Sequence, residues 1–431
     1  MVAGESTERI HKLSEKLPHI FTLPNGLRVV FQPVRNQVAH AGITVLAGSR
    51  FEQPHEEGLA HFLEHCIFKG TEKRRAFHVL SRLDSVGGEL NAYTGKEEIC
   101  IYASFSKTYL SRTLELLADI VFHSIFPEKE IQREKEVIVD EINSYLDSPS
   151  ECIFDEFESL IFQNHQLGKN ILGTQESVHS FTRNHLLEYV SRYFGPQNMV
   201  LSIVGQFTEK RINELAQRFF GNYNGLGKSP DLNHFTDYKP TSITKNKSNY
   251  QSHGLMGGIA YPYKAKERKA MVLLSNILGG PALNSRLSLS VREKYGYSYS
   301  IESNYTPYAD TGFHSIYFGT DKRNVQNTLR VIHAELRKLR EQKLGVVQLS
   351  KAKEQLKGHL ALAGESNSGL MLALAKSVLI FDQIDTTREI YRGIDLITSE
   401  NIQDIANEIF DESKLTYLIY NQRDEQDEMY V

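Results

Sequence analysis

Two histidines and a glutamate lie within five residues of the sequence, in His61-Phe62-Leu63-Glu64-His65. The apolar pattern around them predicts a helix from about Pro54 to Phe68. Residues three and four apart on an α-helix project from one side, so His61, Glu64 and His65 share a face. Neutral imidazoles are good ligands for Zn²⁺, and a neighbouring carboxylate can accept a proton from a metal-activated water. The stretch therefore predicts a zinc site that has Glu64 as its general base.

The same five residues also have a simpler interpretation, a helix with two hydrogen-bonded histidines and a surface glutamate. The chain has 16 histidines in 431 residues, so chance would produce the pattern in roughly a few per cent of such sequences. Against the simpler interpretation, the polar face lies next to Leu59, Phe62 and Phe68, where unpaired polar groups are costly. The order of residues is also the inverse of the metalloprotease signature His-Glu-x-x-His. We therefore favour the metal site.

A catalytic zinc site needs a third protein ligand and an open position for water. A second helix, predicted from Pro127 to about Leu146, carries Glu134 and Glu141. These two residues are seven apart, or two helical turns, and therefore point the same way. Both lie among apolar residues, where a carboxylate needs a charge partner. Either glutamate is a chemically sensible third ligand.

The residues around these motifs resemble the M16 metallopeptidases, the pitrilysin or insulinase family. Within that family the chain is most similar to the short-chain branch related to the mitochondrial processing peptidase β subunit. Glu141 follows His65 by 76 residues, which is the family's spacing. The flanking stretches that match are Gly48-Ser49-Arg50, Gly58-Leu59-Ala60 and Phe68-Lys69-Gly70-Thr71. The resemblance implies one Zn²⁺ per chain, with Glu64 as general base, Glu134 as an accessory acidic residue, and three metal ligands: His61, His65 and Glu141.

The stretch from Gly87 to Thr94 resembles the family's strand beside the zinc. There, substrate adds as an extra strand, and the resemblance implies that Asn91 and Ala92 face it. Backbone pairing of this kind gives affinity without demanding a particular side-chain sequence. The alternative for Asn91 is a turn residue at the end of a strand.

The second half of the chain is similar to the family's C-terminal signature, in which an arginine and a tyrosine seven residues later approach the zinc. Arg292 and Tyr299 have this spacing, although the residues between them depart from the usual pattern. Strand alternation would place Tyr295, Tyr297 and Tyr299 on one face, and we choose Tyr299. The alternative for Arg292 is a solvated charge on a helix.

The elements that must position these residues occur twice along the chain. Strands and helices alternate up to about residue 220, and a stretch rich in Gly, Asn, Lys, Ser and Pro follows before a similar order begins again. We predict an α+β fold of two homologous domains, each a mostly antiparallel sheet packed with helices, rather than one unduplicated domain. The expected boundaries are 1–225 for the zinc-binding domain, 226–252 for a linker and 253–431 for the domain that supplies Arg292 and Tyr299.

Composition excludes several kinds of partner. The 49 basic and 53 acidic residues give a net charge of −4, without the basic excess that nucleic acid requires. No run approaches the roughly 18–20 uncharged apolar residues that span a bilayer, because the longest, 369–381, contains Lys376. The three cysteines fit free thiols in a reducing compartment, and residues 1–16 lack the apolar core of a secretory signal. We therefore expect a cytoplasmic protein.

Together these features predict a zinc-dependent endopeptidase that cleaves peptides or unfolded polypeptides. The resemblance implies a clam-shell assembled from two chains, and we expect a homodimer, with a related second chain as the alternative. The rival function is that of a non-catalytic scaffold or partner subunit of a processing-peptidase-like complex. Such subunits typically lose part of the zinc motif, whereas the motif is complete here.

Overall fold

The computed structural model describes residues 17–225 and 227–422, which form two compact units. Residues 1–16, on which the expectation about a secretory signal depends, lie outside the described residues. The first unit comprises Met1–Val139, Ile171–Asp231 and Leu362–Thr386. The second comprises Asp140–Asn170, Leu232–Ala361 and Thr387–Val431. Both units therefore combine segments that are distant in the sequence.

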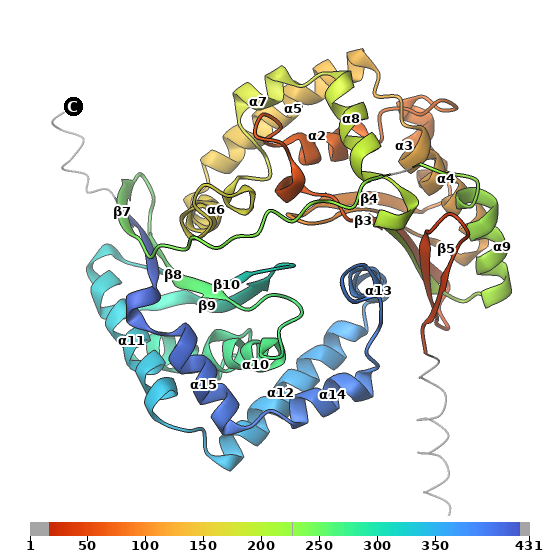
Figure 1. The fold of residues 1–431 in the computed structure, drawn as a ribbon. Helices are drawn as coiled ribbons and strands as arrows, with labels where there is room; N and C mark the ends of the chain where they lie inside the picture. Colours follow the sequence, from red (N-terminus) through yellow and green to blue (C-terminus); the bar gives the residue numbers. More distant parts are fainter. Residues whose placement is uncertain (1–16, 226, 423–431) are drawn as a thin grey trace, which may run out of the picture. The chain divides into compact units, whose positions relative to one another are not determined.

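The first unit is built on a six-stranded sheet (Figure 1). All neighbouring strands are antiparallel except β2 and β6, which run parallel. The last strand of the order, β4, pairs with β5 alone in the described part of the chain, so its other edge is open to a further strand. The strands, in spatial order, are β1 (His19–Thr22), β2 (Arg28–Pro33), β6 (Met199–Gly205), β3 (Val38–Val45), β5 (Ile99–Ser106) and β4 (Glu89–Thr94).

Helices cover both faces of this sheet, which explains why β6 is buried along its whole length. Alternate residues of β6, among them Val200 and Val204, pack against α13 (Asn367–Phe381), and Ser202 Oγ donates a hydrogen bond to the Met371 carbonyl at 2.8 Å. The other helices of this unit are α2 (Leu59–Cys66), α3 (Ala76–Asp84), α4 (Leu110–His123), most of α5 (Glu128–Leu146), α7 (Gln175–Ser180), α8 (Arg183–Tyr193) and α9 (Glu209–Phe220). The apolar run at 369–381 is thus a helix that covers a sheet, and none of the described helices is long and apolar enough to cross a bilayer.

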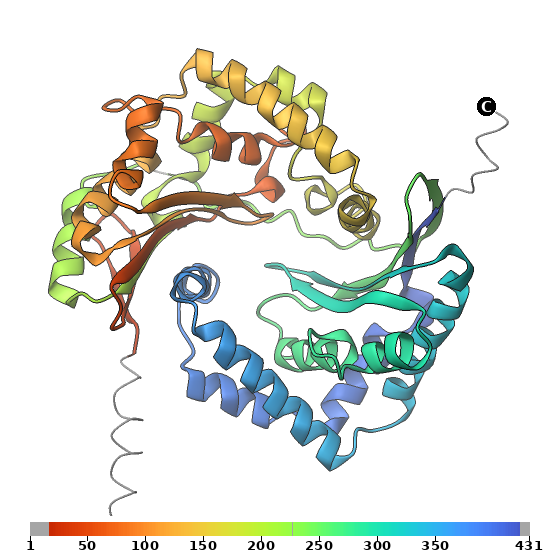
Figure 2. The ribbon, with the colours of Figure 1, turned by 180° about the vertical axis from the view of Figure 1, so that it is seen from behind.

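The second unit has a five-stranded sheet with the same scheme. In spatial order its strands are β7 (Ser242–Lys247), β11 (Thr416–Gln422), β8 (Ser252–Ala260), β10 (Gly312–Thr320) and β9 (Ser298–Pro307). One face is covered by α6 (Pro149–Ile161; Figure 2). Phe157 and Ile161 of this helix pack against the sheet. The remaining helices are α10 (Arg268–Gly279), α11 (Val325–Glu341), α12 (Val346–Gly364), which extends across the boundary between the two units, α14 (Thr387–Asp395) and α15 (Ser399–Ile409).

The two sheets confirm the predicted duplication. The order β2-β6-β3-β5-β4 matches β7-β11-β8-β10-β9, and in each sheet only the first of these pairs is parallel. The α+β class is confirmed with it. The three cysteines are free thiols, also as expected.

The compact units differ from the continuous segments expected at 1–225 and 253–431. The first unit takes α13 from the second half of the sequence, and the second unit takes α6 from the first half. The stretch 226–252, expected to be a linker, contains β7, a strand of the second sheet. Five of the six side chains of β7 are exposed, so the strand lacks the apolar alternation that would reveal it in the sequence.

We expect His314 of β10 to make the second unit sensitive to acid. The side chain is 1% exposed and its ring packs edge-on against Phe410 at 5.5 Å, and this burial lowers the pKa of His314 to about 4. An unfolded histidine has a pKa near 6.5, so the unfolded state binds the proton first as pH falls. We expect His314 to cost about 1.4 kcal/mol of stability per pH unit between roughly pH 6.5 and 4.

The measurement is urea unfolding of metal-free wild type and His314→Leu at pH 7.5, 6 and 5. The variant should lose less stability than wild type on acidification, because leucine cannot be protonated. Parallel pH profiles for the two proteins would show that His314 does not carry this sensitivity.

Candidate metal centre

Helix α2 presents its polar residues from a well-anchored position. Phe62 and Leu63 are fully buried, and the Phe62 ring packs against Phe181 at 5.4 Å. The helix is shorter than predicted, because the backbone of Gly58 takes a φ of +92° immediately before Leu59. A left-handed residue cannot continue an α-helix, so residues 54–58 form turns instead. His61, Glu64 and His65 all lie within α2, so their predicted helical spacing is unaffected.

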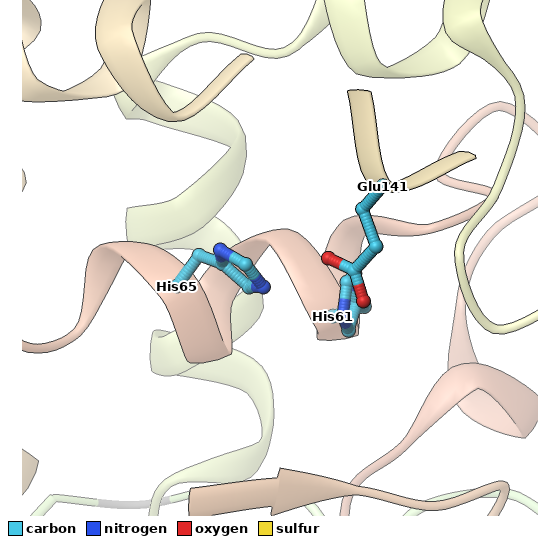
Figure 3. Close-up of side chains that lie close together, drawn as sticks. All are labelled: His61, His65 and Glu141. Atoms are coloured by element: carbon cyan, nitrogen blue, oxygen red, sulfur yellow. The ribbon is translucent and has the colours of Figure 1, made fainter. Parts of the chain in front are cut away.

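The three predicted ligands lie close to one another in the structure (Figure 3). One ligand atom each of His61, His65 and Glu141 lies within 4.8 Å of the other two. The histidine rings are one helical turn apart, with centroids at 4.7 Å. Glu141 reaches them from α5, a single continuous helix, and of the two glutamates offered by the sequence it is the one beside both imidazoles.

The chemistry of this donor set fits Zn²⁺. Ligand atoms around a tetrahedral zinc ion are about 3.5 Å apart, so the spacing found here requires only a small closure of the side chains. Burial, together with the neighbouring His65, lowers the pKa of His61 to about 4. His61 is therefore neutral at pH 7, which is the form that binds a metal ion.

Glu134 contacts His65 and is not one of the three clustered ligands. Its carboxylate is 3.4 Å from His65 Nδ1 and forms an ion pair with Lys69 Nζ at 2.7 Å. Burial by itself raises the pKa of Glu134, but the hydrogen bonds and charges of His65 and Lys69 outweigh it and hold the pKa below its usual value. A charged Glu134 can orient the His65 ring and leave Nε2 for a metal. The contact with His65 is consistent with the accessory role expected of Glu134, which stays a prediction.

Glu64 and β4 are both connected with the helix that carries the two histidines. Glu64 is half-buried on α2, one residue before His65 in the sequence. Strand β4 is joined to α2 by a hydrogen bond of 3.4 Å from Thr94 Oγ1 to the Ala60 carbonyl. Asn91 and Ala92 pair with Tyr102 and Ile101 of β5, so both lie in a strand rather than in a turn. Asn91 is exposed and Ala92 is half-buried. A peptide that paired with the open edge of β4 would lie next to a strand that contacts α2.

Arg292 and Tyr299 belong to the second unit, where they line one pocket of about 270 Å³. Arg292 lies in a short π-helix, Ser288–Lys294, and forms an ion pair with Glu293 at 3.4 Å. Tyr299 lies on β9 and is 83% exposed, so its hydroxyl is accessible. The expectation of three tyrosines on one strand face is wrong, because β9 begins at Ser298 and the rings of Tyr295 and Tyr297 stack on each other before it, at 5.3 Å.

The structure adds two residues that sequence reasoning did not single out. Lys69 forms an ion pair with Glu134. The sequence signal that could have identified Lys69 is its place in the family-like stretch Phe68-Lys69-Gly70-Thr71. Glu52 accepts hydrogen bonds from the backbone amides of Gly58 and Ala60 at the start of α2. No standard capping pattern has this spacing, so the sequence offers no local signal for Glu52.

Comparison with known proteins agrees with this architecture. The family model described as "Insulinase (Peptidase family M16)" matches residues 28–175, and that described as "Peptidase M16 inactive domain" matches residues 180–356. The fold is similar to "a protease from Helicobacter pylori", with a TM-score of 0.87 and 22% identity over 94% of this chain and 99% of that one. It is equally similar to a "peptidase M16 inactive domain from Pseudomonas fluorescens", with a TM-score of 0.88 and 17% identity over 95% of this chain and 99% of that one.

Sequence relatives extend over nearly the whole chain. The "Uncharacterized zinc protease YmxG" of Bacillus subtilis is 33% identical over 401 residues, which cover 93% of this chain and 97% of the relative. An "Uncharacterized zinc protease" of Rickettsia felis is 34% identical over 394 residues, covering 91% and 95%. The chain therefore belongs to the M16 peptidase family, among relatives that are named zinc proteases.

Proposed function

We propose that this protein is a zinc-dependent endopeptidase of the inverted His-x-x-Glu-His type. The observation that carries the proposal is the convergence of His61, His65 and Glu141 within 4.8 Å, with Glu64 on the same helix as both histidines. Two imidazoles and one carboxylate form a three-ligand set that leaves a position open for water, as catalytic zinc sites require. A scaffold subunit has no need for a complete set of this kind, so the rival function is disfavoured.

The chain's own residues divide the chemistry between them. Zinc, when bound, would polarise the scissile carbonyl and lower the pKa of water to about 7. Glu64 takes the proton from the attacking water and later delivers it to the leaving amine. Glu134 keeps His65 oriented through Nδ1, and Lys69 keeps Glu134 charged. Tyr299 and Arg292 are proposed to stabilise the developing oxyanion.

The open edge of β4 supports peptides and unfolded polypeptides as the substrate class. Strand addition requires a substrate segment that is already extended, and it binds backbone rather than particular side chains. Asn91 and Ala92 are the residues of β4 that we propose to face the added strand. The three free thiols fit a reducing compartment, and we propose the cytoplasm.

We further propose a homodimer in which Arg292 and Tyr299 complete the active site of the partner subunit. Their pocket and exposed tyrosine hydroxyl leave both side chains accessible to a second molecule. A divided pair with a related second chain is the alternative assembly.

Removal of one ligand tests the metal site. Purified protein should bind about one zinc per chain, and His65→Ala should weaken zinc binding by several kcal/mol because one of three protein ligands is lost. The control is His78→Ala, which removes an exposed histidine of α3 from the same unit. Metal analysis after dialysis measures both variants, and full zinc occupancy and activity in His65→Ala would contradict the assignment.

Glu64→Gln tests the general base. Glutamine keeps the size of the side chain but cannot accept the proton, so zinc should remain while peptide cleavage falls at least about 100-fold. Glu136→Gln, a change at an exposed position of α5, should have no effect. Undiminished cleavage by zinc-loaded Glu64→Gln would move the role of base to another residue.

Mixing two inactive variants tests the assembly. Glu64→Gln and Tyr299→Phe chains should each be poorly active, but a mixed dimer would contain one site with both residues intact. If half of the dimers are mixed, subunit exchange should restore up to about a quarter of wild-type activity. No recovery despite verified exchange would mean that each site is completed within one chain or that Tyr299 is not catalytic.

A further inference from the structure

Helix α2 begins without a capping side chain of its own. Its N-cap residue is Gly58, which offers no oxygen from a side chain, and the first turn contains no acidic residue. A helix start leaves up to four backbone N–H groups without intrahelical partners. The helix has only eight residues, so disorder of its first turn would remove much of its length.

The carboxylate of Glu52 supplies the missing cap from outside the helix. Its Oε1 accepts the Ala60 N–H at 2.7 Å, and its Oε2 accepts the Gly58 N–H at 3.1 Å. The residue is 3% exposed, so both hydrogen bonds are shielded from water. Burial raises the pKa of Glu52 well above its usual range, and the two backbone hydrogen bonds act against this by favouring the charged form. Ala60 directly precedes His61, so the first turn that Glu52 holds contains a predicted metal ligand.

The segment that carries Glu52 is itself anchored. Tyr189 Oη donates to the Gly48 carbonyl at 3.0 Å and accepts the Gly48 N–H at 2.9 Å. Tyr193 Oη donates to the Phe51 carbonyl at 2.7 Å, next to Glu52. Arg50 forms a buried ion pair with Glu97 at 2.6 Å. Three anchors on a five-residue segment make Glu52 a fixed point rather than a mobile surface acid.

We infer that Glu52 is a positioning residue for the metal centre, which holds the first turn of α2 so that His61 and His65 face one ion together. The inference rests on the proposed zinc site. Glu52 touches neither substrate nor metal in this scheme and acts through the backbone of α2.

The number of acceptor oxygens distinguishes this role from simple packing. Glu52→Gln preserves the shape of the side chain but replaces one oxygen with an NH₂ group, which would face a backbone N–H. Glu52→Asp keeps both oxygens but is one methylene shorter. The structure also offers a matched control in Glu56, which is 3% exposed, pairs with Arg192 at 2.6 and 2.7 Å through its side chain and caps no amide of α2 with its carboxylate.

The experiment measures zinc affinity by chelator competition, the visible absorption spectrum of the cobalt-substituted protein, and the melting temperature of the metal-free form. In Glu52→Gln we expect zinc affinity to fall about tenfold or more and the cobalt spectrum to change, as happens when partners behind a metal ligand are lost. Glu52→Asp should lie between this variant and wild type. Glu56→Gln should melt at a lower temperature but keep zinc affinity within about threefold and an unchanged spectrum.

Each result decides between specific conclusions. Wild-type zinc affinity and an unchanged cobalt spectrum in Glu52→Gln would overturn the inference while leaving the proposed function intact. Equal losses of zinc affinity in Glu52→Gln and Glu56→Gln would also overturn it, because the effect would then be general loosening. If Glu52→Gln does not fold, Glu52→Asp decides by the same two measurements. Wild-type protein that binds no zinc at this site would overturn the proposed function and this inference with it.

Discussion

The partnering of buried charges around α2 is the constraint on which the candidate site depends. Glu52 and Glu134 are each at most 7% exposed, and a buried carboxyl group is tolerated only where hydrogen bonds or cations compensate it. Two backbone amides of α2 and the residue before it donate to Glu52, whose pKa burial still raises well above its usual range, whereas Lys69 and His65 hold the pKa of Glu134 below its usual value. Glu52 precedes α2 and Glu134 belongs to α5, so the geometry of this two-turn helix depends on segments outside it.

The histidine pair of the metal cluster occurs in only one of the two homologous units, within the described residues. Five strands of each sheet follow the same order with the same single parallel pair. Helix α10 follows β8 as α2 follows the corresponding strand β3, yet α10 contains no histidine, cysteine, aspartate or glutamate. In the described residues, the first unit supplies both histidines of the one cluster of metal-binding side chains, while the second supplies a pocket lined by Arg292 and Tyr299. This division agrees with the two family models, the second of which describes an inactive domain.

The local chemistry of the site could be predicted from the sequence because it follows from helical periodicity. The spacing of His61, Glu64 and His65 is enough to place them on one face, and two helical turns place Glu134 and Glu141 alike. Periodicity could not choose between those glutamates, whereas the structure places Glu141 beside both histidines, as the family's spacing anticipated. Strand β4 was anticipated by the resemblance of the stretch from Gly87 to Thr94 to a strand of the family.

Other features depend on contacts between distant segments, and no local pattern encodes them. The exchange of α6 and α13 between the two sheets is a tertiary choice, and an apolar helix looks the same whichever sheet it covers. Strand β7 was assigned to a linker because its side chains are exposed and polar. Glu52 was overlooked because its carboxylate reaches amides six and eight residues later through a folded loop.

The central claim is that His61, His65 and Glu141 hold one zinc ion. The most direct test is a crystal structure of the zinc-loaded protein with diffraction data collected on both sides of the zinc absorption edge. The account predicts an anomalous peak at bonding distance, about 2.0–2.2 Å, from one nitrogen of each histidine and from the Glu141 carboxylate. A zinc-loaded protein whose anomalous peak lay elsewhere, with these three side chains uncoordinated, would contradict it.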